Sequence, residues 1–202
     1  MTDLLLLRPM TLDDLDDVAA LDSRAFGESG WSRRYFEGEL TQSPISVFYV
    51  LADAQRQIVG YFGTWHVVDQ LHLCTFAVDP DRQGRGLGAL LLNCVVRLAQ
   101  RLQCGLIQLE VRESNEVARS LYRSRGFTDE AVRSNLYSNP REDGVLMGMP
   151  TPAQIDHASW QRVGADRPSG LLLRWDDRGG LNGGALAGPL THLRYTSRHE
   201  PQ

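Results

Sequence analysis

A strand, a glycine-rich turn and a long amphipathic helix follow one another directly in residues 76–102. The turn holds Gly84, Gly86 and Gly88, and apolar residues then recur at three- and four-residue steps from Leu87 to Leu102. That spacing is typical of a helix with one buried face. The first turn of a helix has free N–H groups, and glycines let an anion approach them closely. The segment therefore predicts a phosphate-binding turn, unless the glycines only cap the helix.

The other patterns in residues 1–150 predict a mixed fold. Three aromatic and β-branched runs with short polar links indicate an antiparallel meander. Thr11, with an acid three positions later, is a helix-start signal. The fold class is α/β (α+β), with a mixed, mostly antiparallel sheet flanked by helices. The expected strands are 4–8, 47–52, 58–68, 71–78, 106–111, 130–137 and 145–149, and the expected helices are 11–22, 32–40, 87–102 and 115–125.

The composition changes near Pro150. Residues 151–202 contain 7 glycines and 4 prolines among 52 positions, and 178–184 has the composition of a flexible linker. We expect one domain over 1–150, followed by a Gly/Pro-rich extension over 151–202 that is partly disordered. Residues 170–175 could form a strand or pack as a hydrophobic patch.

Charge and cysteine content exclude several functions. All 21 basic residues are arginines, and the net charge of −4 argues against nucleic-acid or anionic-membrane binding. No apolar run approaches the roughly 20 residues that a membrane span needs. Three cysteines without paired spacing predict neither a disulfide framework nor a metal site. We expect a metal-free protein in the reducing cytoplasm.

Three phosphate-binding motifs compete at the glycine turn. A Walker loop requires a lysine, which this chain lacks. Gly84-x-Gly86-x-x-Ala89 matches a dinucleotide fingerprint, with Glu110 as a candidate ribose ligand. However, five residues separate Val78 from Gly84, and only one βαβ-like unit is present. The third motif is Gln83-x-x-Gly86-x-Gly88.

This third motif belongs to an ordered series. Phe76-Ala77-Val78 precedes it, and Leu109-Glu110-Val111-Arg112, Ser114-Asn115, 121–127 and 133–137 follow. The series resembles the GNAT superfamily of acyl-CoA-dependent N-acetyltransferases, and is most similar to the bacterial RimI-type enzymes. Those enzymes acetylate the N-terminal alanine of a small-subunit ribosomal protein.

The resemblance implies a sheet that is splayed at an acyl-CoA cleft, with acetyl-CoA as the acyl donor. The β-strand 71–78 would bind the pantetheine arm, and the Val78 N–H would stabilise the thioester oxygen. The implied donor-binding residues are Phe76, Ala77, Val78, Gln83, Gly84, Arg85, Gly86, Leu87, Gly88 and Asn115.

Two residues are candidates for proton transfer. Glu110 lies in a strand with Leu106, Ile107, Leu109 and Val111, where a carboxylate is costly unless it has a partner or a function. We expect it to be the general base. The alternative is a structural carboxylate paired with Arg112 or Arg119. Tyr122 would protonate the leaving thiolate as general acid, unless it is only a core residue.

The acceptor is expected to be a protein N-terminus, with that of a ribosomal protein as the first candidate. Phe26, Trp31, Ser32 and Tyr137 resemble the positions that line the peptide groove of RimI-type enzymes, although Trp31 could be core. The chain departs from the pattern at Leu136 and by the added residues 27–30. The alternatives are a small-molecule amine acetyltransferase or a non-catalytic acyl-CoA-binding module.

Overall fold

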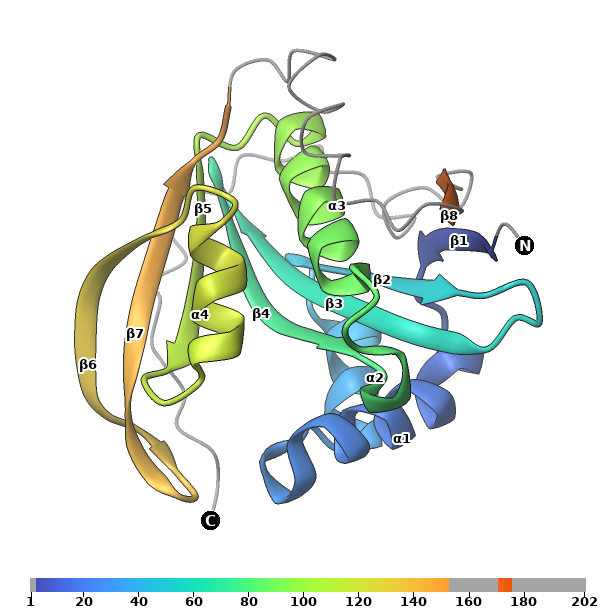
Figure 1. Ribbon diagram of the computed structural model, residues 1–202, viewed down its shortest axis with the longest axis horizontal. Coiled ribbons are helices and arrows are strands. Elements are labelled where there is room, and N and C mark those ends of the chain that lie inside the picture. Colours follow the sequence, from blue (N-terminus) through green and yellow to red (C-terminus); the bar gives the residue numbers. More distant parts are fainter. Residues whose placement is uncertain (1–2, 153–170, 176–202) are drawn as a thin grey trace.

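The computed structural model describes residues 3–152 and 171–175. Eight strands form one sheet, and four α-helices and three short 3-10 turns accompany it (Figure 1). The strands are β1 (Asp3–Pro9), β2 (Ser46–Ala52), β3 (Ile58–Val67), β4 (Gln70–Val78), β5 (Leu106–Arg112), β6 (Thr128–Ser138), β7 (Arg141–Pro150) and β8 (Leu171–Trp175). The helical elements are η1 (Leu12–Asp14), α1 (Leu15–Phe26), η2 (Gly27–Ser29), α2 (Arg33–Gln42), η3 (Pro80–Arg82), α3 (Leu87–Arg101) and α4 (Glu116–Arg123).

The sheet is mixed and mostly antiparallel. Its strand order is β6-β7-β5-β4-β3-β2-β1-β8. Strands β1 to β4 pair antiparallel with their neighbours in sequence, and β7 pairs antiparallel with both β5 and β6. Only β4–β5 and β1–β8 are parallel. The predicted fold class and the β2–β3–β4 meander are therefore confirmed.

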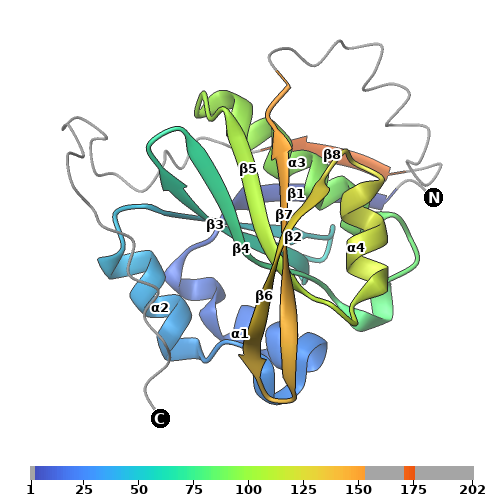
Figure 2. The ribbon, with the colours of Figure 1, turned by 90° about the vertical axis from the view of Figure 1, so that its left-hand side faces the viewer.

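The two faces of the sheet carry different helices (Figures 1 and 2). Helices α3 and α4 cover the larger hydrophobic cluster, which includes Leu73, Leu91 and Leu109. Helices α1 and α2 cover the smaller one, which includes Val18, Phe36 and Tyr61. Because side chains alternate along a strand, β2, β3 and β4 contribute to both cores.

The first helix begins and ends later than the sequence predicts. The Asp14 carboxylate accepts the Thr11 N–H at 2.8 Å and pairs with Arg8 at 2.6 Å. These contacts hold residues 12–14 in the η1 turn, so α1 starts at Leu15. It continues through Phe26 and stops at Gly27, whose φ of 61° is readily adopted only by glycine.

Part of the C-terminal extension joins the sheet. Residues 171–175 form β8, parallel to β1 from Asp3↔Leu171 to Leu7↔Trp175. The strand alternative for this stretch is confirmed. The expected disorder falls on 153–170 and 176–202, which lie outside the described residues. Across the described ranges, no helix is long and apolar enough to span a membrane.

Candidate active site

Strands β4 and β5 pair over only part of their length and then separate. Their register runs from Gln70↔Leu106 to Leu73↔Leu109 and stops there. On the other side of β4, Gly63 pairs with Thr75 and Thr64 with Leu73, so Cys74 is an extra residue in the ladder. Such a bulge bends its strand and ends regular pairing. The bulge lies where β4 parts from β5, and it accounts for the splay that the resemblance implied.

Beyond the bulge, the backbone of β4 presents polar groups toward this gap. The Asp79 N–H donates to the Val59 carbonyl at 3.0 Å, so position 79 faces β3. Hydrogen-bonding direction alternates along an antiparallel strand. The N–H groups of Phe76 and Val78 therefore point toward the gap, where β5 offers them no pairing. The outward Val78 carbonyl accepts from Gln83 Nε2 at 3.3 Å.

The glycine turn starts α3 beside this open edge. Gly84 and Gly86 have φ values of 71° and 77°, and Gly86 is the N-cap of α3. A Cβ added at Gly84 would meet nothing within 4 Å. The first N–H groups of α3 have no intrahelical acceptor, and residues with positive φ in a turn orient such groups toward one concave point. The turn and the open β4 edge thus fit a ligand that carries both a phosphate and an extended, hydrogen-bonding chain.

The positive charge near this turn is smaller than its sequence suggests. Arg82 pairs with Asp53 at 3.4 Å, which leaves it partly neutralised. Arg85 is exposed at the start of the turn. An anion at this turn would therefore be held mainly by backbone N–H groups and by Arg85.

Glu110 lies on β5 immediately after the last β4–β5 pair. Its neighbours Leu109 and Val111 are buried in the larger core, so Glu110 projects from the opposite face. Arg133 Nη1 on β6 lies 2.8 Å from Oε1, as an ion pair without hydrogen-bond geometry. The alternative that Glu110 pairs with Arg112 or Arg119 is therefore wrong in its choice of partner. Arg112 pairs with Glu142 at 3.2 Å, and Arg119 pairs with Glu116 and Asp129, both at 2.9 Å.

Tyr122 lies on the other side of the same gap. Its side chain is buried within the larger core, with the ring centroid 6.3 Å from Phe76 of β4 and 5.9 Å from Phe127. Within the described residues, its hydroxyl makes no hydrogen bond. Burial, and secondarily Tyr137, raises the pKa of this phenol. Tyr122 is therefore a neutral proton donor at physiological pH.

Tyr137 links the two candidates electrostatically. Burial raises the pKa of Tyr137 to about 12, and the next largest cause is the charge of Glu110. The Arg112 guanidinium lies 4.2 Å from the centroid of its ring. Glu110 and Tyr122 come from opposite faces of the sheet, and Tyr137 interacts with both.

The other predicted acceptor residues lie at the junction of α1 and α2. Trp31 packs on Tyr35 at 4.4 Å between centroids and contacts the smaller core. The Ser32 hydroxyl caps α2 by accepting the Tyr35 N–H at 3.2 Å. Phe26, at the end of α1, is 41% exposed. Trp31 and Ser32 thus have structural contacts of their own, and Phe26 is an exposed aromatic side chain.

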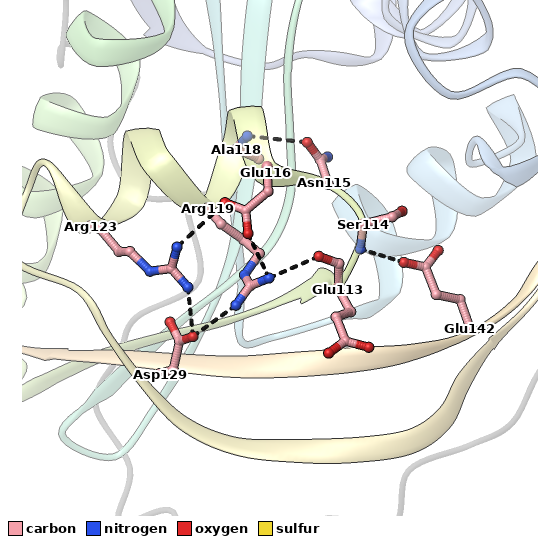
Figure 3. Close-up of polar contacts among 9 residues, drawn as sticks. All are labelled: Glu113, Ser114, Asn115, Glu116, Ala118, Arg119, Arg123, Asp129 and Glu142. Carbon is pink, nitrogen blue, oxygen red and sulfur yellow. Dashed lines mark hydrogen bonds and ion pairs between the residues drawn. The ribbon is translucent and has the colours of Figure 1, made fainter.

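Asn115 begins α4. Its Oδ1 accepts the Ala118 N–H at 3.1 Å as the N-cap, which Figure 3 shows. In the same view, Arg119 donates to the Glu113 carbonyl at 2.9 Å and to Asp129 at 2.9 Å. These contacts fix the start of α4, which carries Tyr122 about two turns further on.

Sequence reasoning missed a buried carboxylate behind the acceptor residues. Asp22 is fully buried and accepts from the Tyr61 hydroxyl and the Trp31 N–H. Burial raises its pKa. Asp22 lies on the apolar face of α1 beside Leu21. An acidic residue at an apolar position of the helix pattern is the sequence signal that could have identified it. The described residues contain no group of three metal-ligating side chains.

Comparisons with known proteins agree with this geometry. The acetyltransferase (GNAT) family matches residues 13–127. The ribosomal protein bS18-alanine N-acetyltransferase of Salmonella typhimurium (strain LT2) is 33% identical over 143 residues, which are 70% of this chain and 94% of that protein. The crystal structure of the ribosomal-protein-S18-alanine N-acetyltransferase from Escherichia coli aligns with a TM-score of 0.67 and 28% identity, covering 75% of this chain and 97% of that one.

A more distant structure shares the fold alone. Ard1 from Thermoplasma volcanium aligns with a TM-score of 0.66 at 21% identity, over 73% of this chain and 98% of that one. The family match spans more than half of the sequence and includes the β4–β5 gap, the glycine turn and the start of α4. The chain therefore belongs to the acetyltransferase (GNAT) family and is an acyltransferase.

Proposed function

We propose that this enzyme transfers the acetyl group of acetyl-CoA to the α-amino group of a protein N-terminus. The observation that carries the proposal is the β4–β5 gap, with Glu110 on one face of the sheet and Tyr122 on the other. A reaction centre in this gap is accessible to a base and an acid from opposite sides. A module that only binds acyl-CoA requires neither.

The donor would be held mainly by backbone groups. The turn at Gly84, Gly86 and Gly88 offers N–H groups to the pyrophosphate, and Phe76 and Val78 offer their free N–H groups to the pantetheine arm as a strand would. Bound acetyl-CoA supplies the activated acetyl thioester. The Val78 N–H is the donor best placed to stabilise negative charge on the carbonyl oxygen.

Glu110 acts as the general base in this proposal. An α-amino group has a reference pKa of about 7.7–8.0, against about 10.4 for lysine, so an N-terminus loses its proton more readily. A single carboxylate, acting directly or through one water, can take that proton. Glu110 Oε1 is buried, and within the described residues its charged partner is Arg133, at 2.8 Å without hydrogen-bond geometry.

Tyr122 acts as the general acid. Its raised pKa keeps the phenol protonated at physiological pH. Its ring touches Phe76, one of the two residues whose N–H groups face the gap. It would pass its proton to the sulfur that leaves when the amine forms its new bond to the acetyl carbon.

We further propose the N-terminal alanine of a small-subunit ribosomal protein as the acceptor. The Salmonella and Escherichia relatives that carry this activity in their names align over 70% and 75% of this chain. Phe26, Trp31, Ser32 and Tyr137 would bind the first residues of the acceptor. Residues 1–150 would form the complete transfer domain, and the enzyme would act in the cytoplasm.

Turnover on matched acceptors tests the proposal. Purified enzyme and acetyl-CoA are incubated with a peptide that begins with alanine, the same peptide blocked at its N-terminus but carrying an internal lysine, and spermidine. We expect acetylation of the free N-terminus at least tenfold faster than that of the other two. Preferred turnover of spermidine would identify a small-molecule acetyltransferase, and acetyl-CoA binding without any transfer would identify a binding module.

A further inference from the structure

Arg112 contacts two segments that lie far apart in the sequence. Its Nη2 donates to the Ser29 hydroxyl at 3.2 Å and to the Asn139 carbonyl at 2.7 Å. Ser29 belongs to η2, which follows α1, and Asn139 belongs to the turn between β6 and β7. One nitrogen of one side chain therefore joins these two segments.

The other guanidinium nitrogen fixes Arg112 to the β6–β7 hairpin. Nη1 donates to the Pro140 carbonyl at 3.1 Å and pairs with Glu142 at 3.2 Å. The planar guanidinium also lies 4.2 Å from the Tyr137 ring centroid. Glu142 in turn accepts the Ser114 N–H at 2.6 Å, which connects the hairpin to the loop before α4.

The two joined segments also touch each other directly. The Ser29 hydroxyl donates to the Asn139 carbonyl at 2.9 Å, and Asn139 Nδ2 donates to Glu28 at 3.2 Å. Glu28 and Ser29 belong to the added residues 27–30. We call the whole set the Arg112 cluster. It consists of Glu28, Ser29, Arg112, Tyr137, Asn139, Pro140 and Glu142.

The Arg112 cluster lies on the acceptor side of the sheet. Residues 110 and 112 are two positions apart on β5, so their side chains share a face, about 7 Å apart along the strand. Both positions lie beyond the last β4–β5 pair, Leu73↔Leu109. The electrostatic effect of Glu110 on Tyr137 places the cluster close to the proposed base.

Arginine suits this role and lysine does not. Its planar group carries five N–H donors, so it can serve acceptors on both segments and stack on an aromatic ring at once. A lysine ammonium at the end of a flexible chain cannot keep that geometry. The Arg112 side chain is only 21% exposed, so its contacts are shielded from competition by solvent.

From this arrangement we propose that Arg112 is the positioning residue of the acceptor site. It holds η2 and the β6–β7 turn together on the face of β5 that carries Glu110, and it orients Tyr137. Both segments are then already ordered when the acceptor N-terminus binds. Its affinity is therefore not reduced by the entropy cost of ordering them. The inference rests on the proposed function, because it assigns the acceptor to this face.

Steady-state kinetics of Arg112→Gln and Arg112→Lys test this role. We expect the KM for an alanine-initiated peptide to rise about tenfold in both variants, with kcat and the KM for acetyl-CoA unchanged. Arg141→Gln is the matched control. Arg141 lies in the same hairpin, is exposed, and bonds to Asn135 within that hairpin. Wild-type acceptor KM in Arg112→Lys would show that charge alone is needed and would overturn the positioning role.

Hydrogen exchange without any acceptor tests the bridge itself. In Arg112→Gln, amide exchange should rise in both 27–30 and 138–142, whereas Arg141→Gln should affect only the hairpin. Unchanged exchange in 27–30 would overturn the inference whether or not the enzyme acetylates N-termini. If no peptide N-terminus is a substrate, the proposed function fails, and the exchange result still decides whether Arg112 joins the two segments.

Discussion

The proposed donor side and the proposed acceptor side of this enzyme are built in different ways. The donor side consists of β4 beyond its bulge and the glycine turn, a nearly continuous stretch from Cys74 to Gly88 that offers mainly backbone N–H groups. The acceptor side consists of side chains from η2, β5 and the β6–β7 hairpin, joined across 110 residues of sequence between Ser29 and Asn139. Because the CoA portion of the donor is the same for every acceptor, the donor side can stay constant. The acceptor side can change through substitutions of single side chains.

The largest expected effect is at Glu110, where the two sides meet. Replacing Glu110 with Gln keeps its size and removes the base, so kcat should fall by roughly 10²–10⁴-fold. The KM for acetyl-CoA should be unchanged, because donor binding uses backbone groups. Glu113→Gln makes the same chemical change three residues along, at an exposed site, and should retain full activity. Near-normal turnover by correctly folded Glu110→Gln would show that Glu110 is not the general base.

Tyr122 is expected to have the next largest effect. Tyr122→Phe should lower kcat roughly 10²-fold, because the leaving sulfur loses its proton donor. Its hydroxyl makes no hydrogen bond within the described residues, so the free energy of unfolding should change by less than about 0.5 kcal/mol. Denaturant unfolding beside kinetics separates these outcomes.

The raised pKa of Tyr122 also predicts the alkaline part of the wild-type pH profile. Tyr122 loses its proton only when the pH exceeds its pKa in the folded enzyme, and that pKa lies above the ordinary value of 10. The kcat profile should therefore not fall between pH 8 and pH 9.5. A fall with a midpoint in that interval, at constant fold, would contradict Tyr122 as the acid.

Two glycines allow a matched comparison of the donor and acceptor sides. Gly84 and Gly27 have φ values of 71° and 61°, and an added Cβ would meet nothing within 4 Å at either. Alanine at either position should strain the backbone, because L-residues rarely adopt a positive φ. Only Gly84→Ala should raise the KM for acetyl-CoA, by about threefold to tenfold. Equal changes in the KM for acetyl-CoA in both variants would show that the glycine turn does not bind the donor.

The smallest effect on catalysis is expected at the far edge of the sheet. A chain ending at Pro152 lacks β8, which pairs with β1 four strands away from β5. Its kcat and both KM values should stay within about twofold of the full chain. The uncovered β1 edge should promote association at high concentration, which light scattering would detect. A large loss of activity would show that residues 1–150 are not a complete transfer domain.

The same contrast explains what the sequence could predict. The strands, the helix from Leu87 and the glycine turn are encoded by local periodicity and backbone chemistry, and they were predicted close to their observed bounds. The end of α1 was placed four residues early, at Asp22 instead of Phe26. The Asp22 carboxylate is buried and accepts from the Tyr61 hydroxyl and the Trp31 N–H, and α1 continues past it.

The charge partners on the acceptor side could not be predicted in the same way. Glu110 was expected to pair with an arginine close to it in sequence if it was structural, but Arg133 of β6 is its partner. Strand order decides that pairing, because β7 lies between β5 and β6. The irregular β6–β7 register beyond Arg133 then sets which β6 side chains extend across β7 to β5. Sequence spacing carries no information on either point.

The central claim is that the β4–β5 gap is where donor and acceptor meet. A crystal structure of the enzyme with CoA joined covalently to an alanine-initiated peptide tests it most directly. We expect the pyrophosphate at residues 84–88, the pantetheine arm along Phe76 and Val78, and the peptide on the Glu110 face beside the Arg112 cluster. A conjugate whose pantetheine arm lies outside the gap, or whose peptide lies on the α3–α4 face, would contradict it.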